Sequence, residues 1–158
     1  MKRGTFLVVL LASAMIFMGA KKPESLRYDI ECAGNGSQGS YLVKVWVYSK
    51  SSKVNVENLR KYAVHGVIFR GYAGKTNCVQ QRALASSPAV EQQQADFFNA
   101  FFNIDKAYAK YATEVGSSIE SIKVGKEYKH GAIVSVAKDM LRQDLEKAGI
   151  IQSLNNGF

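Results

Sequence analysis

The two histidines of this sequence, His65 and His130, are its first candidates for acid–base chemistry. A histidine can act as a general base near neutral pH. Neither one has an acidic residue at a recognisable catalytic spacing, and no Gly-x-Ser-x-Gly motif offers a nucleophilic serine. Two distant histidines also make no zinc site without carboxylates, which the sequence does not single out. We therefore predict no catalytic residue and no metal site, and a hydrolase would need residues that meet only in three dimensions.

Two glycine-rich segments resemble nucleotide-binding loops without meeting their requirements. Residues 34–39 spell Gly-x-Gly-x-x-Gly, but such a loop must join a strand to a helix, and residues 41–48 alternate like a strand. Residues 71–76 end like a P-loop, yet Phe69 stands where the first glycine belongs and a helix is expected before the loop. We interpret the first segment as a hairpin turn and expect no cofactor.

Cys32 and Cys78 are the only cysteines. An even number of cysteines in an exported chain is compatible with one disulfide. The alternative is two buried thiols, because a free cysteine packs as a small hydrophobic residue. The wide separation and the absence of a Cys-x-x-Cys motif argue against a zinc site or a redox motif.

Basic residues outnumber acidic ones, 21 to 13, which gives a formal net charge of +8. A positive surplus favours anionic partners such as lipid headgroups, acidic glycans or an acidic protein face. The bases are scattered, and Lys123, Lys126 and Lys129 form the nearest approach to a cluster. These three lysines are candidates for an anion-binding patch, and the alternative is an ordinary solvated surface. No motif for nucleic-acid binding is present.

Residues 1–20 are typical of an export signal. Lys2 and Arg3 precede an uncharged apolar stretch over residues 6–18, and Gly19 and Ala20 provide small residues for cleavage. A membrane-spanning helix needs about 20 apolar residues, so a permanent anchor is the weaker interpretation. Cleavage after Ala20 would leave a single domain over residues 21–158, located in the periplasm or at the cell surface, where nucleotide cofactors are scarce.

Periodicity predicts the secondary structure. Alternating residues indicate strands over 26–32, 41–48 and 128–136, and a 3.6-residue period indicates helices over 56–70, 88–102 and 138–148. Residues 108–115 fit either a helix or a strand, and we choose a strand. The order ββααββα predicts an α+β domain with a four-stranded, mostly antiparallel sheet and helices packed on one face.

Several stretches resemble an uncharacterised family of small exported proteins from Bacteroides-type bacteria. They are residues 28–32 with the glycine turn, 41–49, 63–71, 97–102, the long run 124–151 and the final Gly-Phe. The resemblance covers nearly the whole mature chain. That family has no assigned activity, so the resemblance implies export and one domain but transfers no site residue.

These observations predict a periplasmic or cell-surface interaction protein, an accessory of the bacterial envelope without catalytic activity. The alternative is a binding domain for a small or anionic envelope ligand, in which tyrosines and lysines line the site. The numerous aromatic residues could form such a groove, although aromatic residues also favour strands and cover sheets.

Overall fold

The computed structural model describes residues 27–76, 78–116 and 119–153. The expected export signal lies outside these residues. In chain order the elements are β1 (Tyr28–Gly34), β2 (Tyr41–Ser49), α1 (Val56–Phe69), α2 (Ala89–Gln93), α3 (Ala95–Asn99), the π-helix η1 (Ala100–Ile104), the 3₁₀ helix η2 (Ala107–Tyr111), β3 (Ala112–Glu114), β4 (Glu120–Val124), β5 (Glu127–Val136) and α4 (Lys138–Lys147).

The strands of the described residues form one antiparallel sheet in the order β1-β2-β5-β3. Strand β4 also pairs with β5, on the same edge as β3, but along the first half of β5 rather than its last three residues. The α+β class is thus confirmed, but the part of the chain that the structure describes has five strands where the sequence predicted four. The additional strand, β4, is short and exposed at every residue. It therefore lacks the buried alternating positions by which a strand is recognised in a sequence.

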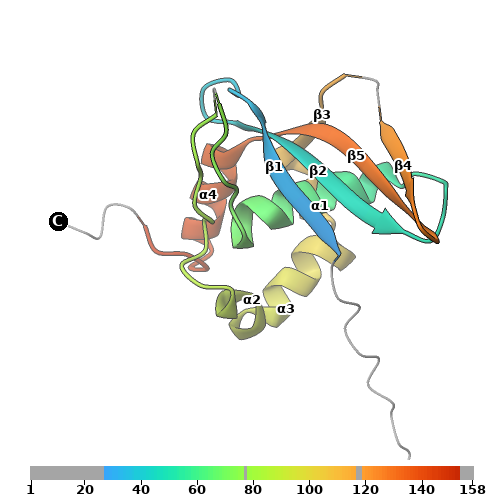
Figure 1. Ribbon diagram of the computed structural model, residues 1–158. Helices are drawn as coiled ribbons and strands as arrows, with labels where there is room; N and C mark the ends of the chain where they lie inside the picture. Colours follow the sequence, from blue (N-terminus) through green and yellow to red (C-terminus); the bar gives the residue numbers. More distant parts are fainter. Residues whose placement is uncertain (1–26, 77, 117–118, 154–158) are drawn as a thin grey trace, which may run out of the picture.

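Helix α1 lies against one face of the sheet, and α2, α3 and η1 lie on the far side of α1 (Figure 1). Because it is covered on two sides, α1 buries every residue from Ala63 to Phe69, more than the single stripe that the sequence predicted. Gly66 permits the close approach to the sheet, since a Cβ at this position would lie 2.6 Å from Ile30 Cδ1. None of the helices in the described residues lies on the other sheet face (Figure 1).

Two predicted elements differ from the structure. The helix expected over residues 88–102 is broken at Gln94, whose backbone leaves the helical region. Helix α2 has no buried residue, so packing does not hold it in line with α3. Residues 108–115 contain both alternatives, a 3₁₀ turn followed by β3. Tyr108 and Tyr111 are buried together because positions three apart share one side of a 3₁₀ helix.

None of the described helices is both long enough and apolar enough to cross a bilayer.

Candidate functional site

His65 stands at the centre of a buried hydrogen-bond chain between the sheet and α2. Its side chain is 5% exposed. The Tyr28 hydroxyl lies 2.6 Å from His65 Nδ1, and the Glu91 carboxylate lies 2.9 Å from His65 Nε2. A carboxylate can only accept a hydrogen bond, so Nε2 carries a proton and donates it. In the neutral ring, Nδ1 then accepts from the Tyr28 hydroxyl.

The surroundings favour the neutral form of both the His65 imidazole and the Tyr28 hydroxyl. Burial lowers the pKa of His65, although the hydrogen bond to Glu91 opposes this shift. Burial also raises the pKa of the Tyr28 hydroxyl well above its usual range, and nearby Arg70 opposes that shift. The chain resembles the base–acid pair of an enzyme, but Tyr28 is only 3% exposed. A substrate therefore has no direct route to its hydroxyl in this conformation.

Arg70 connects this buried chain to the surface. Its guanidinium carbon lies 3.7 Å from the centroid of the Tyr28 ring, and Nη1 donates to the Tyr28 carbonyl oxygen at 2.6 Å. Stacking on an aromatic face and a backbone hydrogen bond together restrict the rotamers of an arginine. Arg70 is thus a surface cation whose position is fixed by the first residue of β1.

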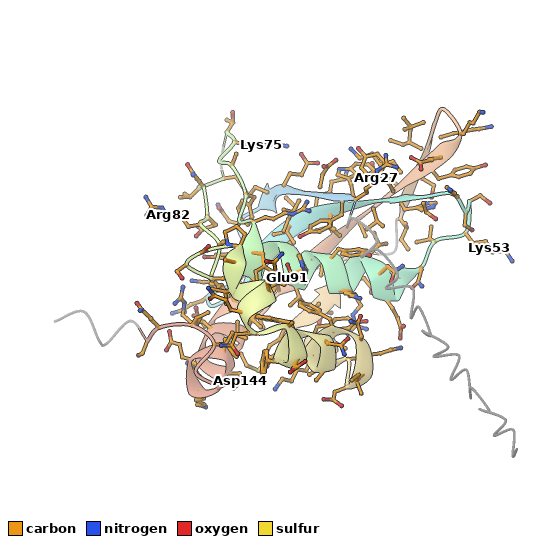
Figure 2. The ribbon with its side chains drawn as sticks, turned by 90° about the horizontal axis from the view of Figure 1, so that it is seen from below. Arg27, Lys53, Lys75, Arg82, Glu91 and Asp144 are labelled. Carbon is orange, nitrogen blue, oxygen red and sulfur yellow. A yellow bond between two sulfur atoms is a disulfide. The ribbon has the colours of Figure 1, made fainter. Side chains whose placement is uncertain are left out.

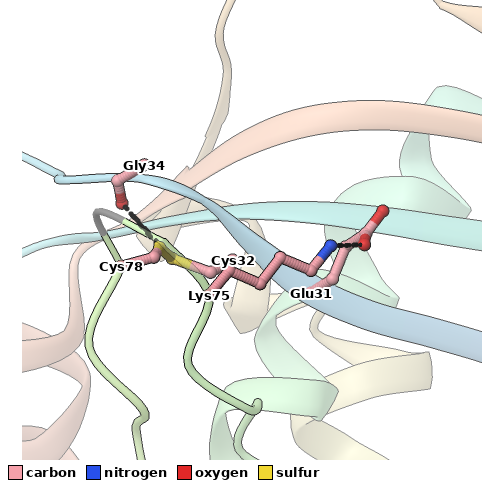
Figure 3. The surroundings of a disulfide bond; sticks show 5 residues. All are labelled: Glu31, Cys32, Gly34, Lys75 and Cys78. Carbon is pink, nitrogen blue, oxygen red and sulfur yellow. Dashed lines mark hydrogen bonds and ion pairs between the residues drawn. A yellow bond between two sulfur atoms is a disulfide. The ribbon is translucent and has the colours of Figure 1, made fainter.

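A disulfide fixes the segment that follows α1. Residues 71–83 form a loop that folds back on itself, and its Cys78 is joined to Cys32 of β1, with Cα atoms 6.3 Å apart (Figure 3). Both candidates from the sequence therefore meet in the structure. Lys75 of the same loop pairs with the Glu31 carboxylate, and this hydrogen bond lowers the pKa of Glu31. The loop is attached to β1 by one covalent bond and one ion pair.

An open cleft of about 560 Å³ lies between the start of β1 and this loop, with Arg70 and Arg82 in its walls. Tyr72 also lines the cleft, and burial raises its pKa to about 12, so it stays a neutral hydroxyl. Asp29 is the acidic residue of the lining. Its carboxylate accepts from the Tyr48 hydroxyl and pairs with Lys129, each at 3.1 Å.

The outer edge of β4 is a second distinctive surface. Within the described residues β4 pairs only with β5, so its other edge presents unpaired backbone groups. Val115, Ile119, Ile122 and Val124 are between 37% and 50% exposed in and beside this strand. Ile122 and Val124 point to the helix-free face of the sheet, opposite Lys129 and Glu127 on β5.

The three candidate lysines are not gathered on one surface. Lys129 and Lys123 project to opposite faces of the β4–β5 hairpin, because they occupy adjacent pairs of its register. Lys129 is paired with Asp29, while neither Lys123 nor Lys126 has an ion pair among the described residues. The anion-binding patch stays a prediction, and only Lys123 and Lys126 flank the β4 edge.

His130 is buried, in a second hydrogen-bond arrangement. Its Nε2 donates to the Ser51 carbonyl at 2.9 Å, and its Nδ1 lies 2.8 Å from the Ser121 hydroxyl. Hydrolytic sites contain a serine hydrogen-bonded to a histidine, and usually a carboxylate that orients the histidine. In the described part of the chain no carboxylate contacts the His130 ring. The contacts join β4, β5 and the 50–55 loop, which is a structural role.

The glycine-rich segments have the backbone context that their sequences predicted. Residues 35–40 connect β1 to β2 as a hairpin, with a turn closed by Ser40 N donating to Ser37 O at 2.9 Å. Residues 71–76 follow α1 and belong to the disulfide-linked loop. Among the residues that the structure places, no three of His, Cys, Asp and Glu come together as a metal site.

No family model, no curated protein and no solved structure matches this chain. The resemblance to small exported proteins of Bacteroides-type bacteria therefore stays a prediction.

Sequence reasoning missed the partners of His65. Glu91 is 26 positions away in the sequence, and no spacing rule joins it to His65. For Arg70 a signal was present, because in the helix predicted over residues 56–70 it falls near the same stripe as the apolar residues Leu59, Ala63 and Val67. A cation on a buried stripe indicates an aromatic or carbonyl partner, and Tyr28 provides both.

Proposed function

We propose that the protein acts outside the cytosol as an interaction protein of the bacterial envelope, and that its partner adds an extended strand along β4. The export signal predicted over residues 1–20 and the Cys32–Cys78 disulfide support the location, because disulfides persist in oxidising compartments. The periplasm and the cell surface both fit. No catalytic activity is part of this proposal.

The edge of β4 that pairs with no other described strand is the observation that carries the proposal. A free strand edge is a template for pairing with another chain, and natural proteins usually cover it or blunt it. Here the edge combines unpaired backbone groups with aliphatic side chains that remain half exposed, Ile122 and Val124. Main-chain hydrogen bonds along such an edge supply affinity, and alternate side chains supply specificity.

The side chains of β4 define the partner strand. Ile122 and Val124 lie on one face, and Ser121 and Lys123 lie on the other. Opposite charges and apolar pairs are favourable between adjacent strands, whereas like charges are not. The complementary strand therefore carries apolar residues toward the helix-free face and acidic residues opposite Lys123 and Lys126. A protein segment with this alternation is the expected occupant.

Site-specific crosslinking tests the proposal. A photo-reactive amino acid is placed at position 122 of the exported protein in the cells that naturally make it, and a matched one is placed at position 104, where Ile104 is 69% exposed but lies on η1. The expected adduct forms at 122 and not at 104, and it maps to an acidic, alternating segment. A synthetic peptide of that segment should then protect the β4 amides from hydrogen exchange.

Three results would overturn this function. Adducts of equal yield at both positions would show that β4 is no preferred surface. An adduct with a second copy of the chain would make the edge a self-association site. A crosslinked peptide that leaves β4 exchange unchanged, or whose binding survives Lys123→Glu together with Lys126→Glu, would refute strand addition by an acidic partner.

A further inference from the structure

Ser121 and His130 have the mutual contacts of an activated nucleophile and its base. They occupy directly opposite positions of β4 and β5, and the Ser121 hydroxyl lies 2.8 Å from His130 Nδ1. The Ser51 carbonyl oxygen, 2.9 Å from His130 Nε2, can only accept a hydrogen bond, so in the neutral ring the proton is on Nε2. His130 Nδ1 therefore has a lone pair, and the Ser121 hydroxyl donates to it.

The fold holds the base in place and leaves the nucleophile accessible. His130 is 3% exposed, and its ring lies parallel to that of Tyr128, with an interplanar angle of 4°. Ser121 is exposed, so an acyl group can reach its hydroxyl without movement of the fold. A nucleophile beside a base that a third group orients is the general arrangement of covalent catalysis. The Ser51 carbonyl is that third group, and because it carries no full negative charge we expect the reaction to be slow.

The open edge of β4 places positive electrostatic potential beside the hydroxyl. Successive residues of an antiparallel strand direct their N–H and C=O groups alternately to its two sides. Val115 N donates to Ile133 O, so the odd-numbered residues of β5 bond to this side, and their partners in β4 are even-numbered. The N–H of Ser121 therefore points to the edge that pairs with no other described strand. Lys123, on the same face of β4, has no ion pair among the described residues, and both groups can stabilise an oxyanion.

We infer that Ser121 is acylated by carboxylic esters, with His130 as the general base. The Ser121 oxygen attacks the carbonyl carbon of the ester while His130 Nδ1 takes the hydroxyl proton. The C–O bond to the leaving alcohol then breaks, and the alcohol oxygen takes that proton from Nδ1. Water then attacks the acyl group with Nδ1 again as the base. The acyl group leaves as a carboxylic acid, and the Ser121 oxygen regains its proton.

Reaction of the oxidised protein with p-nitrophenyl acetate tests this inference. A burst of p-nitrophenolate is expected, with the acetyl group mapped to Ser121 by peptide mass spectrometry. Ser121→Ala should abolish the burst, and His130→Gln should slow it by about a hundredfold or more, the usual contribution of a general base. Ser86→Ala is the matched control, since Ser86 is also exposed but has no described histidine contact. The Arg82 segment that precedes it lies on the side of the molecule opposite the Lys53 loop (Figure 2).

A thiol at the same position gives a second measurement that retains His130. Cys32 and Cys78 are bridged, so Ser121→Cys and Ser86→Cys each have one free thiol in the oxidised protein. A base that accepts the thiol proton raises the thiolate fraction, so Ser121→Cys should react with iodoacetamide at least about tenfold faster than Ser86→Cys.

Acetylation of lysines without acetylation of Ser121 would overturn the inference, and so would bursts of equal size in the wild type and Ser121→Ala. Equal reaction rates of the two thiols would overturn it even if His130→Gln does not fold. The β4 crosslinking experiment measures binding at position 122 and involves no ester. The proposed function and this activity can therefore fail separately.

Discussion

The imidazole of His65 on α1 donates from Nε2 to the carboxylate of Glu91 on α2, 2.9 Å away. This hydrogen bond attaches a helix that has no buried residue of its own to the centre of the fold. On the other side of the same ring, the Tyr28 hydroxyl ties α1 to the first residue of β1. One histidine thus connects the sheet, the central helix and the outer helical layer.

The stability of the protein should fall as the pH is lowered below about 6.5. The pKa of His65 is lowered in the folded protein, mainly by burial, from its ordinary value of 6.5. Below 6.5 the unfolded chain therefore takes up a proton more readily than the folded one, so the contribution to stability is complete above 6.5 and is lost as the pH falls. One proton gives a slope of at most about 1.4 kcal/mol per pH unit. Denaturant unfolding at pH 7.5, 6.5, 5.8 and 5.0 measures it.

The control for this pH effect is His65→Gln, which removes the titrating ring and retains a polar side chain. Its unfolding free energy should be lower at pH 7.5 but nearly flat between pH 6.5 and 5.0. Glu31 and Asp144, whose pKa values are lowered by their partners, titrate below this window. Parallel slopes for the wild type and the variant would disprove the assignment to His65.

Removal of the tyrosine hydroxyl should lower stability clearly at Tyr28, where it belongs to the buried hydrogen-bond chain, and hardly at all at Tyr48. Tyr28→Phe keeps the ring on which Arg70 stacks but leaves the buried Nδ1 of His65 without its donor. An unsatisfied buried polar atom costs about 1–3 kcal/mol. Tyr48→Phe also deletes a tyrosine hydroxyl, but that group donates to the exposed Asp29, so the expected loss is below about 0.5 kcal/mol. Equal losses in the two variants, measured by denaturant unfolding, would contradict the proposed role of the buried chain.

The fold class could be predicted from the sequence because its main elements bury regular patterns. Val43, Val45 and Val47 are all buried, as the alternation over 41–48 requires. The helix predicted over 56–70 agrees with α1 to within one residue at each end, because Asn55 caps its start and Gly71 follows its end with a φ of +63°. Where packing rather than pattern decides, as in the exposed strand β4, the sequence contains no such signal.

The candidate sites were less predictable than the fold, because each depends on side chains that come together only in the tertiary structure. Arg70 meets Tyr28 across 42 positions, and Arg82 reaches the same cleft from the returning arm of a loop whose shape is not encoded by any period. The cysteines were the exception, since the sequence contains only two of them and a single pairing is open to them. For the lysines, closeness in sequence does not mean one shared face, since Lys123 and Lys129 project to opposite faces of the β4–β5 hairpin, and the anion-binding patch stays a prediction.

Loss of the disulfide should lower global stability and loosen the cleft. Cys32→Ser combined with Cys78→Ser removes a bridge with a sequence separation of 46, worth about 4 kcal/mol in the loop-closure model. Hydrogen exchange should also increase locally at residues 71–76 and 78–83, because the Lys75–Glu31 ion pair does not replace the covalent bond to β1. Denaturant unfolding and exchange mass spectrometry measure the two effects. Alkylation of both thiols in unreduced native protein would refute the bridge itself.

Gly66 should resist replacement by alanine even though it lies inside a helix. Alanine gains about 1 kcal/mol of helix propensity over glycine. Its Cβ would, however, lie 2.6 Å from Ile30 Cδ1 and 3.2 Å from Ile30 Cγ2, and overpacking of a core costs about 1–3 kcal/mol. We therefore expect Gly66→Ala to lower the unfolding free energy by up to about 2 kcal/mol.

The double variant with Ile30→Val shows whether this clash is the cause. Valine lacks the Cδ1 atom that is nearest to the added methyl group, so it gives the alanine room. Ile30→Val alone should cost about 0.5–1.5 kcal/mol. The double variant should lose less stability than the sum of the losses of the two single variants, by at least about 0.5 kcal/mol, because substitutions at residues in contact do not have additive effects. Strict additivity, or a Gly66→Ala variant more stable than the wild type, would mean that the sheet yields at Ile30 and that close packing is not what keeps glycine at position 66.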